Sequence, residues 1–363
     1  KLQLVSLAIC RACRESAEWK VIMHPMTPAT LWAMLNANES SGDYSRVPHL
    51  KLVRQILFLE NTPVTNLLWP VSVRAIVFGS LFNQSISDVV WPRELHCLVF
   101  GNSFNQQVKD VSWPAGLQVL RFWGDFNQSL EGVAWPQGLR EIKLGDAFNQ
   151  PIEEVIWPEG LREFHVGGLF NHPIGGIAWP WGLLYLKLGG RFNQSIVESS
   201  FPVGLQKLTM GESFNQPILG VIWPTKLRQL HLGPSFNQPI EGVTWPAGLQ
   251  TLILGMDFNQ PIEGVVWPTC LKILEFGEDF NHPIEKCSWP PGLKTLRFGG
   301  DFNQPLAGVM WPPGLKILEF GGSFDQPIHD VVWPAGLEEL DLGDGFDQDT
   351  EFVIWPDSLL NRR

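Results

Sequence analysis

The sequence predicts a β-rich solenoid, in which a parallel β ribbon of about 13 coils of 22 residues follows a small α-helical N-terminal cap. Two observations predict the ribbon. Trp recurs at a step of 22 residues from Trp69 to Trp355, with Phe201 filling the one gap. The Phe of a Phe-Asn or Phe-Asp pair keeps the same step from Phe82 to Phe346. Because the period never slips, the coils have one size and can stack on their neighbours.

Each unit reads W-P-x-G-L-x-x-L-x-F-G-x-x-F-N-Q-P-I-x-x-V-x. In the copy GLKTLRFG (292–299), Leu293, Leu296 and Phe298 face one way with polar residues between them, which predicts a short strand with one buried face. Pro after Trp excludes a helix and favours an extended return path. One strand per coil pairs in parallel with the next at about 4.8 Å, so the rungs form a ribbon of roughly 60 Å.

An Asn follows the ladder Phe in most coils and becomes Asp325 and Asp347 in the last two. A buried amide can bond the turn backbone of its own coil and of the next one. We therefore expect a buried, structural ladder that includes Asn127, Asn149, Asn171, Asn193 and Asn215. Three Asn-Gln-Ser glycosylation motifs fall in this column, and we expect them to carry no glycan because the ladder faces inward.

The 22-residue pattern WPxGLxxLxFGxxFNQPI resembles the FNIP repeat, a relative of the leucine-rich repeat, with Trp where the commoner form has Leu before Pro. The match covers about four-fifths of the chain. The resemblance implies a leucine-rich-repeat-like solenoid that serves as a binding scaffold. It does not name the partner, because such repeats bind many unrelated proteins.

The repeat array divides the chain into four segments. Residues 1–46 have apolar residues at helical spacing and are expected to form a helical N-terminal cap, whose first helix also resembles the last helix of an F-box. Residues 47–68 are interpreted as a degenerate capping repeat, with its Leu columns out of register and Glu60 in place of the core Phe. Residues 69–354 are the thirteen repeats, and residues 355–363 form a C-terminal tail.

Composition excludes several classes of function. The net charge of −11 and the absence of Lys/Arg runs argue against a nucleic-acid partner. No stretch reaches the roughly 18 apolar residues of a membrane span. Five scattered Cys, with Cys10-x-x-Cys13 unaccompanied by a second pair, give no metal site. They favour an intracellular, reducing compartment, either the cytoplasm or an organelle if a transit peptide has been removed.

Function is expected on the exposed strand face, where two columns vary most. The second column leans cationic between residues 121 and 187 and suits an extended protein partner rather than a small molecule. Trp123 replaces a column of Gly, which we expect to serve a turn conformation that Gly124 can supply one residue later. Trp and Arg are frequent interface anchors. The predicted partner-binding residues are Arg121, Trp123, Lys143, His165, Tyr185 and Lys187.

Two alternatives to this binding patch stay open. The charges could neutralise one another, with Arg140, Glu141 and Lys143 pairing among themselves and with Glu163, and the Trp123 ring could lie over a neighbouring coil. Glu141 and Glu163 on adjacent rungs could also approach to about 5 Å, the separation in a retaining glycosidase. Lys143 and His165 would however lower the pKa of a catalytic acid placed there.

We therefore expect a non-enzymatic protein–protein interaction scaffold, with no catalytic residues and no cofactor. Two further functions are compatible with the sequence. One is a substrate-recognition subunit of an F-box-type ubiquitin ligase, if residues 1–46 are an F-box remnant. The other is a structural subunit of a large assembly, organellar if a transit peptide precedes it.

Overall fold

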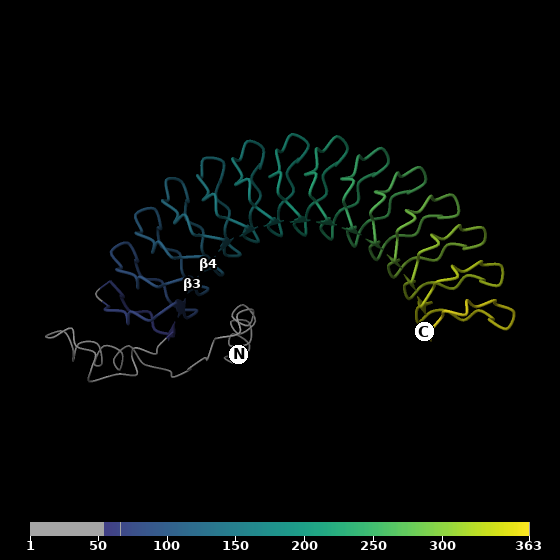
Figure 1. Cartoon of the computed structure of the whole chain (residues 1–363), viewed down its shortest axis with the longest axis horizontal. Helices are drawn as coiled ribbons and strands as arrows, with labels where there is room; N and C mark the ends of the chain where they lie inside the picture. Colours follow the sequence, from purple (N-terminus) through teal and green to yellow (C-terminus); the bar gives the residue numbers. More distant parts are fainter. Residues whose placement is uncertain (1–53, 66, 363) are drawn as a thin grey trace.

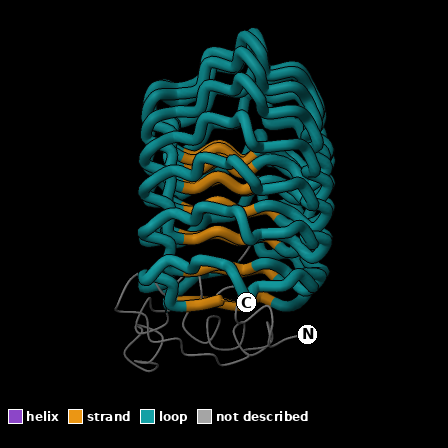
Figure 2. The backbone as a smooth tube through the Cα atoms, turned by 90° about the vertical axis from the view of Figure 1, so that its right-hand side faces the viewer, coloured by secondary structure: helices purple, strands orange, loops and turns teal. Residues whose placement is uncertain are grey.

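The computed structural model describes residues 54–65 and 67–362, which form one curved solenoid. The strands lie along the concave side of the arc and the loops along its convex side (Figure 1). One parallel sheet contains all fifteen described strands in sequence order, and Figure 2 shows these strands stacked as a single ribbon. The predicted parallel-strand solenoid is confirmed. The helical cap, the F-box resemblance and the Cys10–Cys13 pair lie outside the described residues.

The strands are short because only the Leu-x-Phe segment of each unit alternates between the core and the open face. They are β1 (Gln55–Phe58), β2 (Ala75–Phe78), β3 (Cys97–Phe100), β4 (Val119–Phe122), β5 (Glu141–Lys143), β6 (Glu163–His165), β7 (Tyr185–Lys187), β8 (Lys207–Thr209), β9 (Gln229–His231), β10 (Thr251–Ile253), β11 (Ile273–Glu275), β12 (Thr295–Arg297), β13 (Ile317–Glu319), β14 (Glu339–Asp341) and β15 (Asn361–Arg362).

Strand register follows the sequence period from β2 onwards. Thr251 pairs with Ile273 and Leu252 with Leu274, an offset of 22 residues that recurs along the ribbon. At the N-terminal end the offset is 20, because Gln55 pairs with Ala75 and Ile56 with Ile76. The Leu columns of the first repeat are thus two residues out of the 22-residue period, in agreement with the sequence analysis. The turn after β1 is two residues shorter than in later coils, so β1 still pairs with β2, and exposed Glu60 lies outside the strand pairing.

Two aromatic ladders fill the core. Phe82 and its counterparts stack coil upon coil, as in the pairs Phe236–Phe258 at 6.1 Å and Phe280–Phe302 at 6.0 Å between ring centroids. The Trp column stacks in the same way, and Phe201 continues it onto Trp223 at 6.2 Å. Rings spaced by one coil bury a large apolar area in every repeat, so neighbouring coils supply most of the hydrophobic stabilisation of each one.

The Asn ladder exists, but its position differs from the prediction. Asn215 is half-buried and Asn149 is exposed, so the column lies at the surface rather than in the core. Most ladder Oδ1 atoms accept two hydrogen bonds from the next coil, as Asn215 does from the Asn237 N–H at 3.0 Å and from Gln238 Nε2 at 2.9 Å. Asn149 and Asn259 accept only the backbone N–H, because the next coil has His in place of Gln. A parallel column of Gln therefore belongs to the ladder. The inward-facing argument against glycosylation of the Asn-Gln-Ser motifs accordingly fails.

The Gly column that follows the strands has a different role from the one expected. Of its twelve Gly residues, only Gly343 has a positive φ, at 80°. The constraint is close approach of successive coils. A Cβ on Gly189 would lie 1.7 Å from the carbonyl oxygen of Gly167, and a Cβ on Gly233 would lie 1.6 Å from that of Gly211. At these Gly positions a side chain is excluded by the carbonyl of the preceding coil rather than by a turn torsion; Trp123 is the exception in the column.

Residues 355–362, expected as a tail, continue the stack. Trp355 stacks on Trp333 with ring centroids 6.1 Å apart. The Arg362 guanidinium lies 4.6 Å from the centroid of the Trp355 ring, and β15 pairs with β14. This segment therefore has the contacts of a further coil.

Candidate partner-binding face

Strand alternation decides which side chains reach the concave face. In β4, Leu120 and Phe122 are buried in the core, with 0% and 1% of their surfaces exposed. Arg121 between them is half-buried on the opposite side. Trp123 follows β4 and has 45% of its surface exposed. Because side chains alternate along an extended chain, Trp123 projects from the same side as Arg121.

Trp123 occupies an unusual coil. β4 has four residues and β5 has three, so the strand length changes at this point in the ribbon. Gly124 takes a positive φ of 53°, as expected from the sequence. Gly101 and Gly145, which stand in the Gly column in the coils before and after Trp123, do not have a positive φ. The positive φ of Gly124 therefore occurs in the coil that carries the Trp side chain.

The third residues of β4, β5, β6 and β7 stand on neighbouring rungs. Arg121 is paired with Lys143, Lys143 with His165, and His165 with Lys187. Tyr185, the first residue of β7, lies beside them with its ring centroid 4.8 Å from that of His165. The structure thus brings all six predicted partner-binding residues onto adjacent coils of one face.

Part of the positive charge of this patch is neutralised within the chain. Arg121 makes a bidentate ion pair with Glu141, with N–O distances of 2.7 and 2.9 Å. Lys143 lies 3.5 Å from the same carboxylate. Burial alone would raise the pKa of Glu141, but the hydrogen bond and charge of Arg121 outweigh it and hold that pKa below its usual range. Glu141 pairs with Arg121 and Lys143 rather than with Arg140.

His165 adds no charge to the patch. Burial, reinforced by the charge of Lys143, lowers the pKa of His165 to about 3, so the imidazole is neutral at physiological pH. Its Nε2 atom is buried and has no hydrogen-bond partner. The cationic lean expected of this column between residues 121 and 187 therefore depends on Arg121, Lys143 and Lys187.

The patch keeps a net positive charge although His165 is neutral. Lys207 lies with its Nζ 5.0 Å from the Tyr185 ring centroid, and Lys187 is exposed. With Arg121 and Lys143 these make four cations on β4–β8, against the two carboxylates of Glu141 and Glu163. The exposed part of the patch therefore combines a Trp, a Tyr and ammonium groups.

The carboxylate pair on β5 and β6 lies beside an arginine. Glu141 and Glu163 do occupy adjacent rungs, but Arg121 lowers the pKa of Glu141, which disfavours Glu141 as the general acid of such a pair. A hollow beside β13 and β14, lined by Glu319, Glu339 and Asp341, has a volume of about 170 Å³. Pockets for organic ligands are typically about 300–1,000 Å³.

Among the described residues, no group of three or more His, Cys, Asp or Glu side chains could hold a metal ion. Nor do those residues contain a helix with the length and apolar character needed to cross a bilayer.

Trp181 is an exposed aromatic residue that the sequence reasoning missed. It has 66% of its surface exposed, and the Arg162 guanidinium lies 5.9 Å from its ring centroid. Trp181 precedes β7, whereas Trp123 follows β4, so the two lie at opposite ends of the strands. The signal was the second Trp of WPWG (179–182), in a column that other coils fill with small or polar residues.

Comparisons with known proteins agree with this architecture. The FNIP Repeat family matches residues 126–168, 170–213, 214–257, 258–301 and 302–345. The solved structure of CroV588, described as a circular leucine-rich-repeat protein, is similar with 31% sequence identity and a TM-score of 0.69. That comparison covers 86% of this chain and 56% of CroV588, so the present chain spans little more than half of that relative.

Two more distant structures share the fold. An internalin, InlF of Listeria monocytogenes, matches with 13% identity and a TM-score of 0.53 over 87% of this chain and 88% of that chain. A chain of the Toll–Spatzle complex of Drosophila matches with 12% identity and a TM-score of 0.56 over 83% of this chain and 48% of that chain. No curated protein matches the sequence. The matched repeats cover more than half of the residues, and the chain belongs to the FNIP repeat family.

Proposed function

We propose that the protein is a non-enzymatic scaffold that holds an extended protein partner along its concave strand face, with Trp123 as the anchor. The observation that carries this proposal is the exposure of Trp123, 45% of its surface, in a column where the other twelve 22-residue repeats have Gly. An exposed indole beside an Arg is typical of an interface hot spot.

The shape and chemistry of the face support a protein partner. Leucine-rich-repeat-like solenoids are generally protein-interaction scaffolds, and their concave surfaces are long enough to contact an extended partner. The Toll–Spatzle complex, in which one chain shares this fold, is itself an assembly of two proteins. The positive balance of β4–β8 and the aromatic rings of Trp123 and Tyr185 favour a partner segment that presents acidic and aromatic side chains.

The F-box interpretation depends on residues 1–46, which lie outside the described residues. The scaffold proposal is independent of it, because it depends on β4–β8 alone.

The test is the substitution Trp123→Gly. This change converts LRFWGDFNQ (120–128) into LRFGGDFNQ, the sequence that residues 296–304 already have in a stable coil. We therefore expect the melting temperature to change little. We expect partner binding to weaken by about 2 kcal/mol, roughly 30-fold in affinity, because the hot-spot side chain is lost.

The partner would first be isolated by cross-linking with the wild-type protein, and its affinity then measured by calorimetry. Trp181→Ala is the matched control, because it removes an exposed Trp from the other end of the strands and should leave binding on the concave face intact. A sharp fall in melting temperature with unchanged partner affinity would show that Trp123 is a packing residue, and the proposed anchor would be lost.

A further inference from the structure

The two edges of the strand ribbon carry opposite charge. The residue that directly precedes each strand from β2 to β15 is Arg or Lys in seven of fourteen coils and acidic only at Glu338. We call this column the cationic edge. On the opposite side, the two positions after the Gly column contain eight carboxylates and one cation, Arg191. We call these positions the acidic edge.

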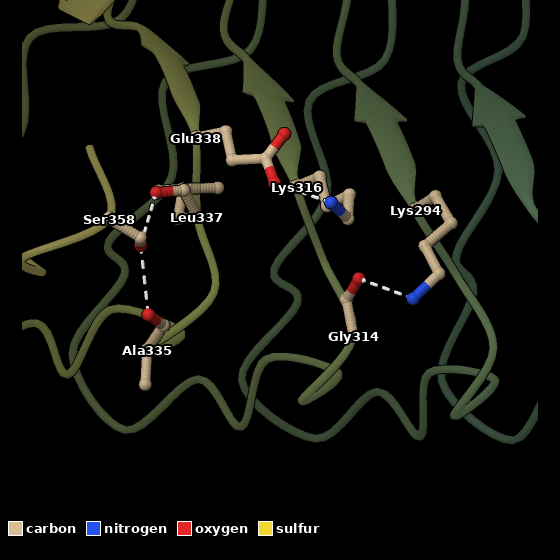
Figure 3. Close-up of polar contacts among 7 residues, drawn as sticks. All are labelled: Lys294, Gly314, Lys316, Ala335, Leu337, Glu338 and Ser358. Atoms are coloured by element: carbon tan, nitrogen blue, oxygen red, sulfur yellow. Dashed lines mark hydrogen bonds and ion pairs between the residues drawn. The ribbon is translucent and has the colours of Figure 1, made fainter. Parts of the chain in front are cut away.

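The cationic edge includes three lysines on successive rungs, Lys272, Lys294 and Lys316, directly before β11, β12 and β13. Like charges on adjacent rungs repel each other. Figure 3 shows Lys294 donating to the Gly314 carbonyl oxygen, at 3.1 Å, and Lys316 paired with Glu338. All three lysines are exposed. Their side chains lie on the surface of this edge and are accessible to an anionic partner.

The acidic edge matches this spacing. Asp257, Asp279 and Asp301 are exposed and follow β10, β11 and β12. Their N–H groups donate to carbonyl oxygens of the preceding coil at 2.8–3.0 Å, which fixes one carboxylate to each coil. Because both edges belong to the same coils, the charges on the two edges are spaced by the same distance, one coil.

We propose that two copies of this chain associate side by side, with the cationic edge of one copy against the acidic edge of the other and a displacement of one coil. The displacement follows from the positions of the charges. It sets Lys272 opposite Asp257, Lys294 opposite Asp279 and Lys316 opposite Asp301. The second copy is therefore the occupant that the charge pattern fits.

The same displacement matches the arginines. It places three further cations opposite carboxylates, in the pairs Arg140–Asp125, Arg162–Asp146 and Arg228–Glu212. The remaining cation, Arg74, comes opposite Glu60 of the shortened first coil. All seven cations thus face a carboxylate. With no displacement only three do, because Arg162, for example, would face Gly168 and Leu169.

One of the uncharged positions of the cationic edge also fits the same displacement. Leu184, before β7, has 38% of its surface exposed, and it comes opposite Leu169, which has 39% exposed. At this rung an apolar residue thus meets an apolar residue. This contact is heterologous, because each copy uses two different edges, so it repeats in one direction and produces an open stack rather than a closed dimer.

Salt dependence is the first test. Exposed ion pairs weaken as ionic strength rises. We expect sedimentation velocity to show concentration-dependent association of the full chain at about 0.02 M salt and its loss at about 0.3 M, where the Debye length is shorter. A monomer at every concentration in low salt would overturn the proposal and leave the cationic edge to a different anionic partner.

Charge reversal locates the surface. The variant K272E/K294E should lower the association constant by about tenfold or more, because two attractive pairs become repulsive. K109E/K286E is the matched control, since it changes the net charge by the same amount at loop positions on neither edge. Equal effects of the two variants would assign the association to net charge and refute the edge contact.

Mixing variants tests the displacement. D257K/D279K alone should not associate, but it should restore association when mixed with K272E/K294E. D279K/D301K has the same net charge. Its two reversed carboxylates are those that would face Lys272 and Lys294 if there were no displacement, so it should restore association with K272E/K294E less well. Greater rescue by D279K/D301K would refute the displacement by one coil.

Discussion

Removing one amide from the Asn ladder gives a sharp test of how the coils are joined. Asn215 Oδ1 accepts hydrogen bonds from the Asn237 N–H at 3.0 Å and from Gln238 Nε2 at 2.9 Å. Asn215→Ala leaves both donors without this acceptor. A hydrogen bond contributes about 1 kcal/mol net, so the two together give about 2 kcal/mol, within a range of about 1–3 because water can reach a half-buried site.

Asn215→Asp is the matched control, because the chain already uses Asp in this column. Asp325 accepts from the Asp347 N–H at 3.0 Å and from Gln348 Nε2 at 2.8 Å, and the hydrogen bond from Gln348 lowers the pKa of Asp325. A carboxylate with a lowered folded-state pKa stabilises the fold above its unfolded pKa, and this contribution is lost as the pH falls through the folded value. Asn215→Asp should therefore match wild type at pH 7 and lose stability in acid.

The measurement is hydrogen exchange at the Asn237 amide together with urea denaturation followed by Trp fluorescence. Exchange is needed because a solenoid can open locally, so a single unfolding free energy can miss the effect. We expect faster exchange at Asn237 in Asn215→Ala and wild-type exchange in Asn215→Asp at neutral pH. If the two variants show the same exchange and the same midpoint, the acceptor oxygen does not hold the coils together and this reasoning is refuted.

Three further predictions follow from other contacts. Gly189→Ala should destabilise by about 3 kcal/mol or more because its Cβ would meet a backbone carbonyl, whereas Gly322→Ala, where no atom lies within 4 Å of the added Cβ, should have little effect on the melting temperature. His165→Thr should remove a pH dependence. The folded pKa of His165 is about 3, against 6.5 for an ordinary His, so the wild-type stability should fall by about 2 kcal/mol relative to the variant between pH 7 and pH 5, because only the unfolded state binds the proton. Ser199→Val should stabilise by about 1–2 kcal/mol in denaturation, since the Ser199 hydroxyl is buried without a hydrogen-bond partner in a column where most coils have Val.

The coil, its single strand and both aromatic ladders could be predicted from the sequence because a strict period transmits one local pattern to every repeat. The side to which the Asn side chains point was harder to predict. The repetition of Asn215 and its counterparts shows that the residue is required, but it does not show whether the amide faces the core or the surface. Only the hydrogen bonds to the next coil reveal that a half-buried Asn can be as constrained as a core residue.

The Gly column illustrates a second limit. A recurring Gly can satisfy either a torsion or a close approach, and the sequence pattern is the same for both. The sequence analysis predicts a torsion, whereas the structure shows a close approach to the preceding carbonyl. At the candidate site, the rungs of Arg121, Lys143, His165 and Lys187 were predicted correctly. The neutral state of His165 was not, because it depends on burial.

The uniform offset of 22 residues between strands also has a genetic consequence. In the interior of the array, removing or duplicating one 22-residue unit would change the length of the arc while each remaining coil still met a neighbour of the same kind. In-frame unequal recombination could therefore lengthen or shorten the binding face, and each resulting protein would still have coils that pack on one another. The first coil is the exception in length, because β1 and β2 are offset by 20 residues, so a copy of that coil inside the array would not match the 22-residue spacing of its neighbours.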